Sequence, residues 1–373
     1  MTRLVIDARL AGHSGIGVYL DQMLPRVVPP LGSWRPVVLA RAATRGDWAS
    51  RLGRAADIFE WDVPPLGVRN LASAPPGLAQ GDLLWTPHFN VPLVGSAPLA
   101  VTLHDLLPLT APRLAGRGRS FAVHRWLTAI RARARVVFCV SEFTRGEAIA
   151  RGALDPARLV VTPLGVDRQW FAPAPAAMGH ADTDLVAQPT IIFVGLLKPH
   201  KNVARLLHAF NNVKTVIPHR LVLVARHEGL RNIDREALSV LRTLGDRIEL
   251  VSDLARADLI ARVQSAQFAV LPSLHEGFGL PALEAMAAAT PVLAGRAGAL
   301  PEVCGDAATY CDPWSVDDIA RGLLLLASDP SLRARLATAG RERATAYTWD
   351  RCAAATAGAL DAALTALRTA SAR

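Results

Sequence analysis

Residues 268–295 read FAVLPSLHEGFGLPALEAMAAATPVLAG, in which two short apolar runs flank a glycine-containing loop and a helical stretch. Continuous apolar runs of this length predict strands buried on both faces, as in parallel sheets covered by helices. The helix is expected to begin near Leu280 or Pro281, because proline is favoured in the first helical turn. The stretch therefore predicts a strand–loop–helix–strand unit of an open α/β sheet.

The same alternation runs along all 373 residues. Because a single core stops growing at roughly 250–300 residues, two doubly wound α/β domains are expected. The predicted strands are 4–8, 36–40, 82–86, 99–103, 136–140 and 159–162, followed by 190–194, 220–224, 248–251, 268–271, 291–293 and 308–311.

A proline- and alanine-rich stretch over 171–189 has no periodicity and predicts a linker. We therefore expect one Rossmann-like domain over 1–170, a second over 190–348, and a C-terminal helix over 349–373 that packs back on the first domain. Ligands of such sheets bind beyond the carboxyl ends of the strands, so two facing domains would form a central cleft.

Composition narrows the class of protein. With 51% hydrophobic and 20% charged residues the chain is globular, and no apolar run approaches the ~18 residues of a membrane span. The N-terminal stretch predicts a first strand and no signal peptide, which leads us to expect a cytoplasmic protein.

The four cysteines have no metal-site spacing and are expected to be buried free thiols; they are Cys139, Cys304, Cys311 and Cys352. A net charge of +9 suits phosphorylated ligands, nucleic acid or an anionic membrane.

The loop between the strand over 268–271 and the following helix carries Glu276, Gly277 and Gly279. The free N–H groups of the first helical turn, together with the glycines, would form an anion site for a phosphate. Glu284 follows eight positions after Glu276, and a carboxylate there can accept hydrogen bonds from a vicinal diol. The alternative is a plain loop with helix-capping acids.

The string EGFGLPALEAMA, followed by PVLAG and GALPEV, resembles the E-x7-E signature of retaining glycosyltransferase family 4. This resemblance covers most of the chain and implies the GT-B fold, with an acceptor-side N-terminal domain and a C-terminal domain that binds a nucleotide sugar. It implies that Glu276 contacts the donor sugar and Glu284 the donor ribose. Ala289 stands where a glycine is common, and little consequence is expected. The residues implied to line the donor beside these acids are Gly277, Phe278, Gly279 and Leu280.

A second motif, FVGLLKPHKNVARLLHAF over 193–210, places a tight exit at Gly195 and a basic loop before a helix capped near Asn202. Fixed cations there would stabilise a departing diphosphate. By resemblance Lys201 is one such cation; the second is usually an arginine, but Leu196 occupies that place, so Lys198 is the candidate. The alternative is a solvated basic turn.

Candidate residues of the first domain also follow strands. The loop DARLAGHSGIGVYL over 7–20 holds Gly15 and Gly17, which the resemblance places beside the donor phosphates; an ordinary tight turn is the alternative. His104 is implied to touch the donor sugar, although a structural hydrogen bond is its alternative role. Ser141 is expected to cap a helix. The weaker candidates, for contact with an acceptor, are Asp105, His88 and Asn90.

The resemblance implies transfer of a hexose from a nucleotide-diphosphate sugar to a glycan or lipid-diphosphate acceptor in polysaccharide biosynthesis. The segments KPHKN and HD resemble polysaccharide mannosyltransferases and favour GDP-mannose, with UDP-glucose or an epimerase of the same fold as alternatives. No metal or cofactor is expected, since no D-x-D or histidine cluster follows a strand. An NAD enzyme would need an acid after the second strand, where Arg41 stands, and nucleic-acid binding would not explain the acid–glycine–acid loop.

The segment RLAGRGRSFAVHRWLTAIRARARV over 113–136 mixes arginine with apolar residues. It predicts either a helix lying on the inner, anionic face of the plasma membrane or a solvated helix whose apolar side is core. Its arginines are Arg113, Arg117, Arg119, Arg125, Arg131, Arg133 and Arg135, and its larger apolar residues are Phe121, Trp126, Leu127 and Ile130.

Overall fold

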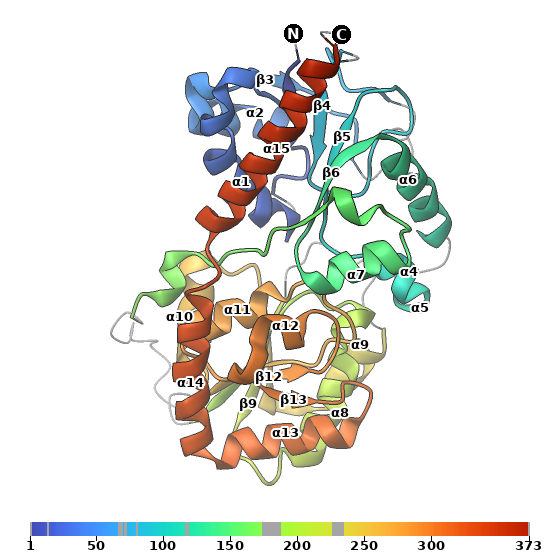
Figure 1. Ribbon diagram of the computed structural model, residues 1–373. Coiled ribbons are helices and arrows are strands. Elements are labelled where there is room, and N and C mark those ends of the chain that lie inside the picture. Colours follow the sequence, from blue (N-terminus) through green and yellow to red (C-terminus); the bar gives the residue numbers. More distant parts are fainter. Residues whose placement is uncertain are drawn as a thin grey trace. The chain divides into compact units, whose positions relative to one another are not determined.

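The computed structural model describes residues 2–12, 15–65, 70, 73–79, 81–115, 119–173, 188–225 and 235–371. The chain divides into two compact units, of which the first joins Met1–Gly165 to Thr348–Arg373 and the second is Val166–Tyr347. Each unit is built on a parallel sheet flanked by helices (Figure 1). Most of the predicted linker, from 174 to 187, lies outside the described residues.

The sheet of the first unit has the order β3-β2-β1-β4-β5-β6-β7. Every pairing is parallel; Val5, for example, pairs with Val37 on one side and with Leu84 on the other. Strands β2 and β3 are added on one side of β1, and β4 to β7 on the other. The boundary between β1 and β4 is therefore the kind of switch point at which open α/β sheets bind ligands. The strands are β1 (Leu4–Asp7), β2 (Val37–Ala40), β3 (Asp57–Glu60), β4 (Leu83–Thr86), β5 (Leu99–Leu103), β6 (Ala134–Cys139) and β7 (Leu159–Val161).

Helices cover both faces of this sheet because successive strand side chains point to opposite sides. The last helix, α15, packs on α1 and β6, so the C-terminal segment returns to the first unit (Figure 1). The helices are α1 (Ile16–Val27), α2 (Ala42–Leu52), α4 (Leu107–Thr110), α5 (Pro112–Ala115), α6 (Arg119–Arg133), α7 (Glu142–Ala150) and α15 (Trp349–Ser371).

Helix α6 tests the two interpretations of the arginine-rich segment. Leu127 and Ile130 are buried in the core of the first unit, and Trp126 packs against that core with its ring 5.6 Å from Phe89. Among the described side chains, the larger apolar ones of the predicted membrane face are therefore core, and the exposed residues of α6 are His124, Arg125, Thr128, Arg131 and Ala132. Arg117 and the side chains of Arg119 and Phe121 lie outside the described part. The exposed arginines of the segment are Arg113, Arg125, Arg131 and Arg135.

The sheet of the second unit has the order β10-β9-β8-β11-β12-β13 and is again parallel throughout. Its switch point lies between β8 and β11, so the loops after these two strands leave the same edge side by side. The strands are β8 (Thr190–Val194), β9 (Arg220–Ala225), β10 (Ile248–Ser252), β11 (Phe268–Leu271), β12 (Val292–Gly295) and β13 (Thr309–Cys311).

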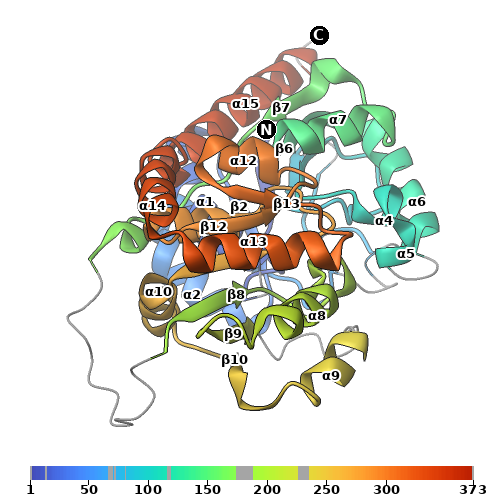
Figure 2. The same cartoon turned by 90° about the horizontal axis from the view of Figure 1, so that it is seen from below.

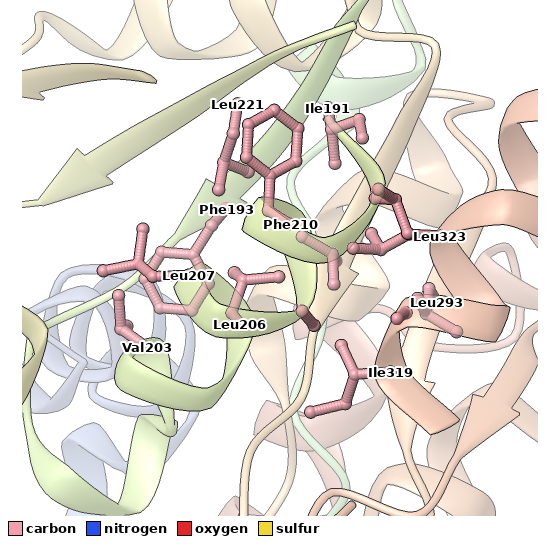
Figure 3. Close-up of a cluster of buried hydrophobic side chains, with 14 of the residues drawn as sticks. Ile191, Phe193, Val203, Leu206, Leu207, Phe210, Leu221, Leu293, Ile319 and Leu323 are labelled. Carbon is pink, nitrogen blue, oxygen red and sulfur yellow. The ribbon is translucent and has the colours of Figure 1, made fainter. Parts of the chain in front are cut away.

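One hydrophobic core of the second unit lies between its sheet and α8 and α13, which run side by side (Figure 2). Figure 3 shows Phe193 and Leu221 from the strands meeting Leu207 and Phe210 of α8, all at most 1% exposed. The helices are α8 (Val203–Val213), α9 (Arg235–Leu241), α10 (Arg256–Ser265), α11 (Leu280–Ala287), α12 (Leu300–Cys304), α13 (Val316–Ser328) and α14 (Pro330–Ala344).

Three local details differ from the expectations. Strand β3 was not predicted, because its four residues are partly exposed and form no apolar run. Asn202 precedes α8 as expected, but its side chain does not cap the helix. Ala289 has φ 57°, in the left-handed region that favours glycine. The expectation of little consequence did not foresee this backbone conformation, which glycine adopts at lower cost than alanine.

Candidate active site

An ion pair joins the two motifs of the second unit. Glu276, in the loop between β11 and α11, is 8% exposed, and its Oε1 accepts a hydrogen bond from Lys201 Nζ at 2.6 Å. Ser273 Oγ donates to the same oxygen at 2.7 Å. Lys201 ends the short 3-10 helix η5 (Pro199–Lys201) after β8. The neighbouring strands thus bring together the two residues that the sequence had placed in separate motifs.

The charge of Glu276 is set by opposing effects. Burial alone would raise the pKa of its carboxyl, but the positive charges of Lys201 and His200, with the hydrogen bonds from Lys201 and Ser273, hold that pKa below its ordinary value. Glu276 is therefore ionised at neutral pH. Oε1 takes both hydrogen bonds that the described residues give this carboxylate, so Oε2 remains to accept from a ligand.

The backbone of Glu276 is clamped by the loop after β12. Ala299 N donates to Glu276 O at 2.9 Å. Gly298 has φ 60°, and a Cβ on it would lie 2.4 Å from Glu276 O, closer than any side chain allows. Sequence reasoning missed Gly298 as part of the site. The only sequence signal for Gly298 was the glycine-containing stretch after β12. That stretch alone predicts neither the positive φ of Gly298 nor its contact with Glu276.

The remaining predicted donor residues surround the start of α11. Gly279 has φ 97°, and a Cβ there would lie 2.6 Å from Leu300 Cδ2, so only glycine fits. Gly277 is buried. Phe278 is 4% exposed, with its ring 5.8 Å from that of Tyr347, so its side chain packs inside the unit.

Helix α11 begins at Leu280 as predicted, but its first turn offers few free N–H groups: Pro281 has none, and Ala282 N and Leu283 N donate to Gly279 O at 3.0 and 3.3 Å. Among the described residues, the Leu280 N–H is the donor of this turn that no backbone oxygen takes. Glu284 lies in the second turn and is half-buried. The acid–glycine loop, the helix start and the second acid therefore occupy one edge of the sheet, as the motif predicts.

The loop after β8 holds Gly195 and Lys198. A Cβ on Gly195 would lie 3.2 Å from the Phe193 ring, so this position keeps the exit from the strand narrow. Lys198 immediately precedes η5 and is half-buried. The structure places Lys198 in the same loop as Lys201, whereas the contact with Glu276 belongs to Lys201.

In the first unit, His104 follows β5 and is half-buried. Burial lowers the pKa of its imidazole to about 4; the nearby His88 ring lowers it further, while Asp105 and the hydrogen bond to Pro87 act in the opposite direction. The ring is therefore neutral at neutral pH. A carbonyl can only accept, so Nε2 carries the proton and donates to Pro87 O at 3.0 Å, which leaves Nδ1 as an acceptor.

The three weaker candidates of the first unit have internal partners. His88 Nδ1 accepts a hydrogen bond from Asn90 N at 3.2 Å. Asn90 is 7% exposed, and its carbonyl accepts from Asn70 Nδ2 at 3.2 Å. Asp105 Oδ1 accepts from Leu107 N at 3.0 Å, at the start of α4. These contacts give each residue a structural role in the strand-end loops.

Sequence reasoning missed an ion pair at the end of β1. Arg9 is 0% exposed and pairs with Asp7, with its Nη2 at 2.6 Å from Oδ2 and its guanidinium 3.3 Å above the Trp61 ring. Nη1 and Nη2 also donate to Val63 O and Asn70 Oδ1. The only signal for this contact was an aspartate at the end of a strand with an arginine two positions later.

The first glycine-containing loop packs tightly. Gly15 precedes α1 with φ 61°. A Cβ on Gly17 would lie 3.1 Å from Gly12 N, so this glycine lets the loop approach the helix. Ser14 lies outside the described residues. Ser141 accepts from Thr144 N at 3.0 Å and caps α7, as predicted.

Comparison with known protein families decides which class of enzyme this chain is. Residues 73–170 match the family model Glycosyltransferase Family 4, and residues 183–343 match Glycosyl transferases group 1. An MMP alpha-(1->4)-mannosyltransferase of Mycolicibacterium hassiacum is 33% identical over 72% of this chain and 66% of its own length. O-antigen chain mannosyltransferase B of Escherichia coli is 30% identical over 69% of this chain and 68% of its own length. This chain belongs to glycosyltransferase family 4.

This glycosyltransferase is therefore a retaining enzyme that uses a nucleotide-diphosphate sugar. Its fold is GT-B: Anabaena Alr3699/HepE, solved in complex with UDP and glucose, superposes with a TM-score of 0.76. That comparison covers 97% of this chain and 100% of the other at 17% identity. The alignments with the two mannosyltransferases span about two thirds of either relative's length.

The cysteines of the glycosyltransferase are buried and unpaired, as expected, and burial raises the pKa of Cys139 and Cys304 to about 12. Within the described residues, no three or more histidine, cysteine or acidic side chains gather as a metal site would require. No helix in that part of the chain is long and apolar enough to cross a membrane.

Proposed function

We propose that this glycosyltransferase transfers mannose from GDP-mannose, with retention, to a glycan or lipid-diphosphate-linked acceptor in polysaccharide biosynthesis. The observation that carries the choice of donor is the similarity to two mannosyltransferases, one of them an O-antigen chain enzyme, at 33% and 30% identity. The KPHKN and HD segments, resembling those of polysaccharide mannosyltransferases, support the same donor.

In this proposal the ion pair of the second unit holds the donor. Lys201 stabilises the diphosphate as negative charge develops on it, with Lys198 as the second cation. Glu276 accepts a hydrogen bond from a hexose hydroxyl through Oε2, because Oε1 is held by Lys201 and Ser273. Glu284 accepts from the ribose hydroxyls. Gly277, Gly279 and the start of α11 supply backbone N–H groups to the phosphates.

Residues of the first unit are proposed to contact the substrates as well. A neutral His104 accepts a hydrogen bond from a donor-sugar hydroxyl at Nδ1, since Nε2 is engaged by Pro87 O. Gly15 and Gly17 let backbone approach the phosphates. Asp105, His88 and Asn90 shape the loops on the acceptor side.

The proposed chemistry is a front-face displacement. The acceptor oxygen bonds to C1 of the sugar on the face from which the diphosphate departs, and the bond between C1 and the phosphate oxygen breaks. The proton of the acceptor hydroxyl passes to the leaving phosphate oxygen, so the products are the glycoside and the nucleotide diphosphate. The protein's part is to hold charges and geometry fixed. A single preorganised hydrogen-bond donor of this kind increases the rate by about 10²–10³-fold.

An exchange screen, in which one nucleotide sugar after another is offered as the donor, tests the proposal. Thermal shift with GDP, UDP and ADP sugars identifies the nucleotide, and release of nucleotide diphosphate with each sugar identifies the hexose. We expect GDP-mannose to stabilise the protein most and to be turned over fastest. UDP-glucose as the preferred donor would contradict the choice of mannose. An epimerised donor without a transfer product would contradict transfer itself.

A further inference from the structure

One amide side chain joins three strand ends of the second unit. Asn202 is 2% exposed, and its Nδ2 donates to Pro272 O after β11 at 2.9 Å and to Pro313 O after β13 at 2.6 Å. The residue itself follows β8. Both hydrogens of a single buried amide thus tie the loop after β8 to the loops after two other strands.

The orientation of this amide is fixed chemically. Both partners of Nδ2 are carbonyl oxygens, which only accept, while Oδ1 accepts from Arg205 Nη1, which only donates, at 2.9 Å. The backbone of Asn202 has φ 61° and ψ 33°, a left-handed conformation that asparagine tolerates better than most residues. The sequence places here a residue that meets both demands.

The hydrogen bonds of the Asn202 side chain, called here the Asn202 tie, lie immediately beside the catalytic candidates. Asn202 follows Lys201, and Pro272 precedes Ser273, the residue that donates to Glu276 Oε1. A backbone bond from Leu274 N to His200 O at 2.8 Å joins the same two loops. The distance between Lys201 and Glu276 therefore depends on how these two loops are held.

We propose that Asn202 is a positioning residue of the donor site, which sets the spacing of Lys201 and Glu276 by holding together the loops after β8, β11 and β13. The inference rests on the proposed roles of Lys201 and Glu276. Displacement of a reacting group by about 1 Å can reduce a rate about hundredfold, so a single loop tie is enough to control turnover.

Two variants separate the amide from the backbone. Asn202→Gly keeps the left-handed conformation and removes the side chain, whereas Asn202→Asp keeps the shape but turns an oxygen toward a carbonyl. Turnover is measured as release of nucleotide from the donor that the exchange screen identifies. We expect both variants to fold and to lower kcat about tenfold to hundredfold, with a smaller change in KM.

Thr290→Val is the matched control. Its hydroxyl donates to Val263 O at 2.8 Å, and the residue is 2% exposed, so the change also removes a buried hydrogen bond in the second unit. It lies at the other end of the sheet, before β12. We expect this variant to lose thermal stability and to keep kcat. If Asn202 had only a structural role, the Asn202 variants would behave in the same way.

A double variant gives the decisive readout. If Asn202 acts through Glu276, then Asn202→Gly has little further effect on turnover in a Glu276→Ala background. Equal fold losses in both backgrounds, wild-type kcat for Asn202→Gly, or failure of both Asn202 variants to fold would each overturn the inference. Full activity of Glu276→Ala alone would instead overturn the proposed function of the site.

Discussion

At the residue scale, Glu284 is the acid whose proposed role is most specific. Glu284→Gln replaces an ionised acceptor by a neutral amide of the same shape. Because a hydrogen bond to a charged group contributes about 1.5–3 kcal/mol, nucleotide binding should weaken roughly ten- to hundredfold. Calorimetry with GDP and UDP measures this directly. Unchanged affinity for both nucleotides would remove Glu284 from the donor site.

Ala289 gives a second prediction at this scale. Its left-handed backbone costs alanine roughly 1–2 kcal/mol, and the extra flexibility of glycine in the unfolded chain offsets part of that. Ala289→Gly should therefore leave the free energy of unfolding unchanged or raise it by up to about 1 kcal/mol. Ala285→Gly, inside α11, is the control and should lower it by about 1 kcal/mol. Equal destabilisation by both changes would contradict the assigned conformation.

Much of the site could be predicted from residue order alone, because the acid–glycine loop and the basic loop each follow a strand. The signal was local: spacing, glycines and charges within one motif. Contacts between motifs gave no such signal. The pairing of Lys201 with Glu276, the clamp at Gly298 and the tie at Asn202 depend on which strands are neighbours in the sheet.

At the element scale, the loop after β8 contains two lysines whose contributions can be separated. Lys201→Ala should lower turnover about 10²–10³-fold, because it removes charge that stabilises the departing diphosphate. Lys198→Ala should have a comparable effect only if it acts as the second cation. Steady-state nucleotide release measures both. An unchanged rate for Lys198→Ala would leave Lys201 as the one lysine of this loop acting on the diphosphate.

Helix α6 leads to a prediction about membranes. Its larger described apolar side chains are core, and its exposed arginines can attract anionic lipid at about 1 kcal/mol each. We expect co-sedimentation with anionic vesicles at low salt, loss of that binding at high salt, and none with neutral vesicles. Arg125→Gln with Arg131→Gln should reduce it. Equal, negligible binding to neutral and anionic vesicles would remove the membrane surface from this account.

The elements themselves were largely predictable, since buried parallel strands read as continuous apolar runs. Strand β3 escaped because an edge strand with partly exposed residues lacks that pattern. The sequence of α6 left two interpretations open, since both place arginines on one side and apolar residues on the other. Only the packing of Leu127 and Ile130 against the sheet separates them.

At the scale of the whole molecule, two parallel sheets each end in loops that carry candidate residues. The charged groups lie mainly in the second unit, where Lys201 and Glu276 meet. The first unit contributes a neutral histidine and glycine-containing turns. In the proposed function, the charge that acts on the departing diphosphate therefore comes from the second unit.

The central claim is that the Lys201–Glu276 centre performs sugar transfer. The most direct test is the steady-state rate of GDP release from GDP-mannose by the wild type and by Glu276→Ala, with GDP affinity measured in parallel. The account predicts a rate about 10²–10³-fold lower for the variant, with GDP bound nearly as tightly as by the wild type. Full transfer activity of Glu276→Ala would contradict it.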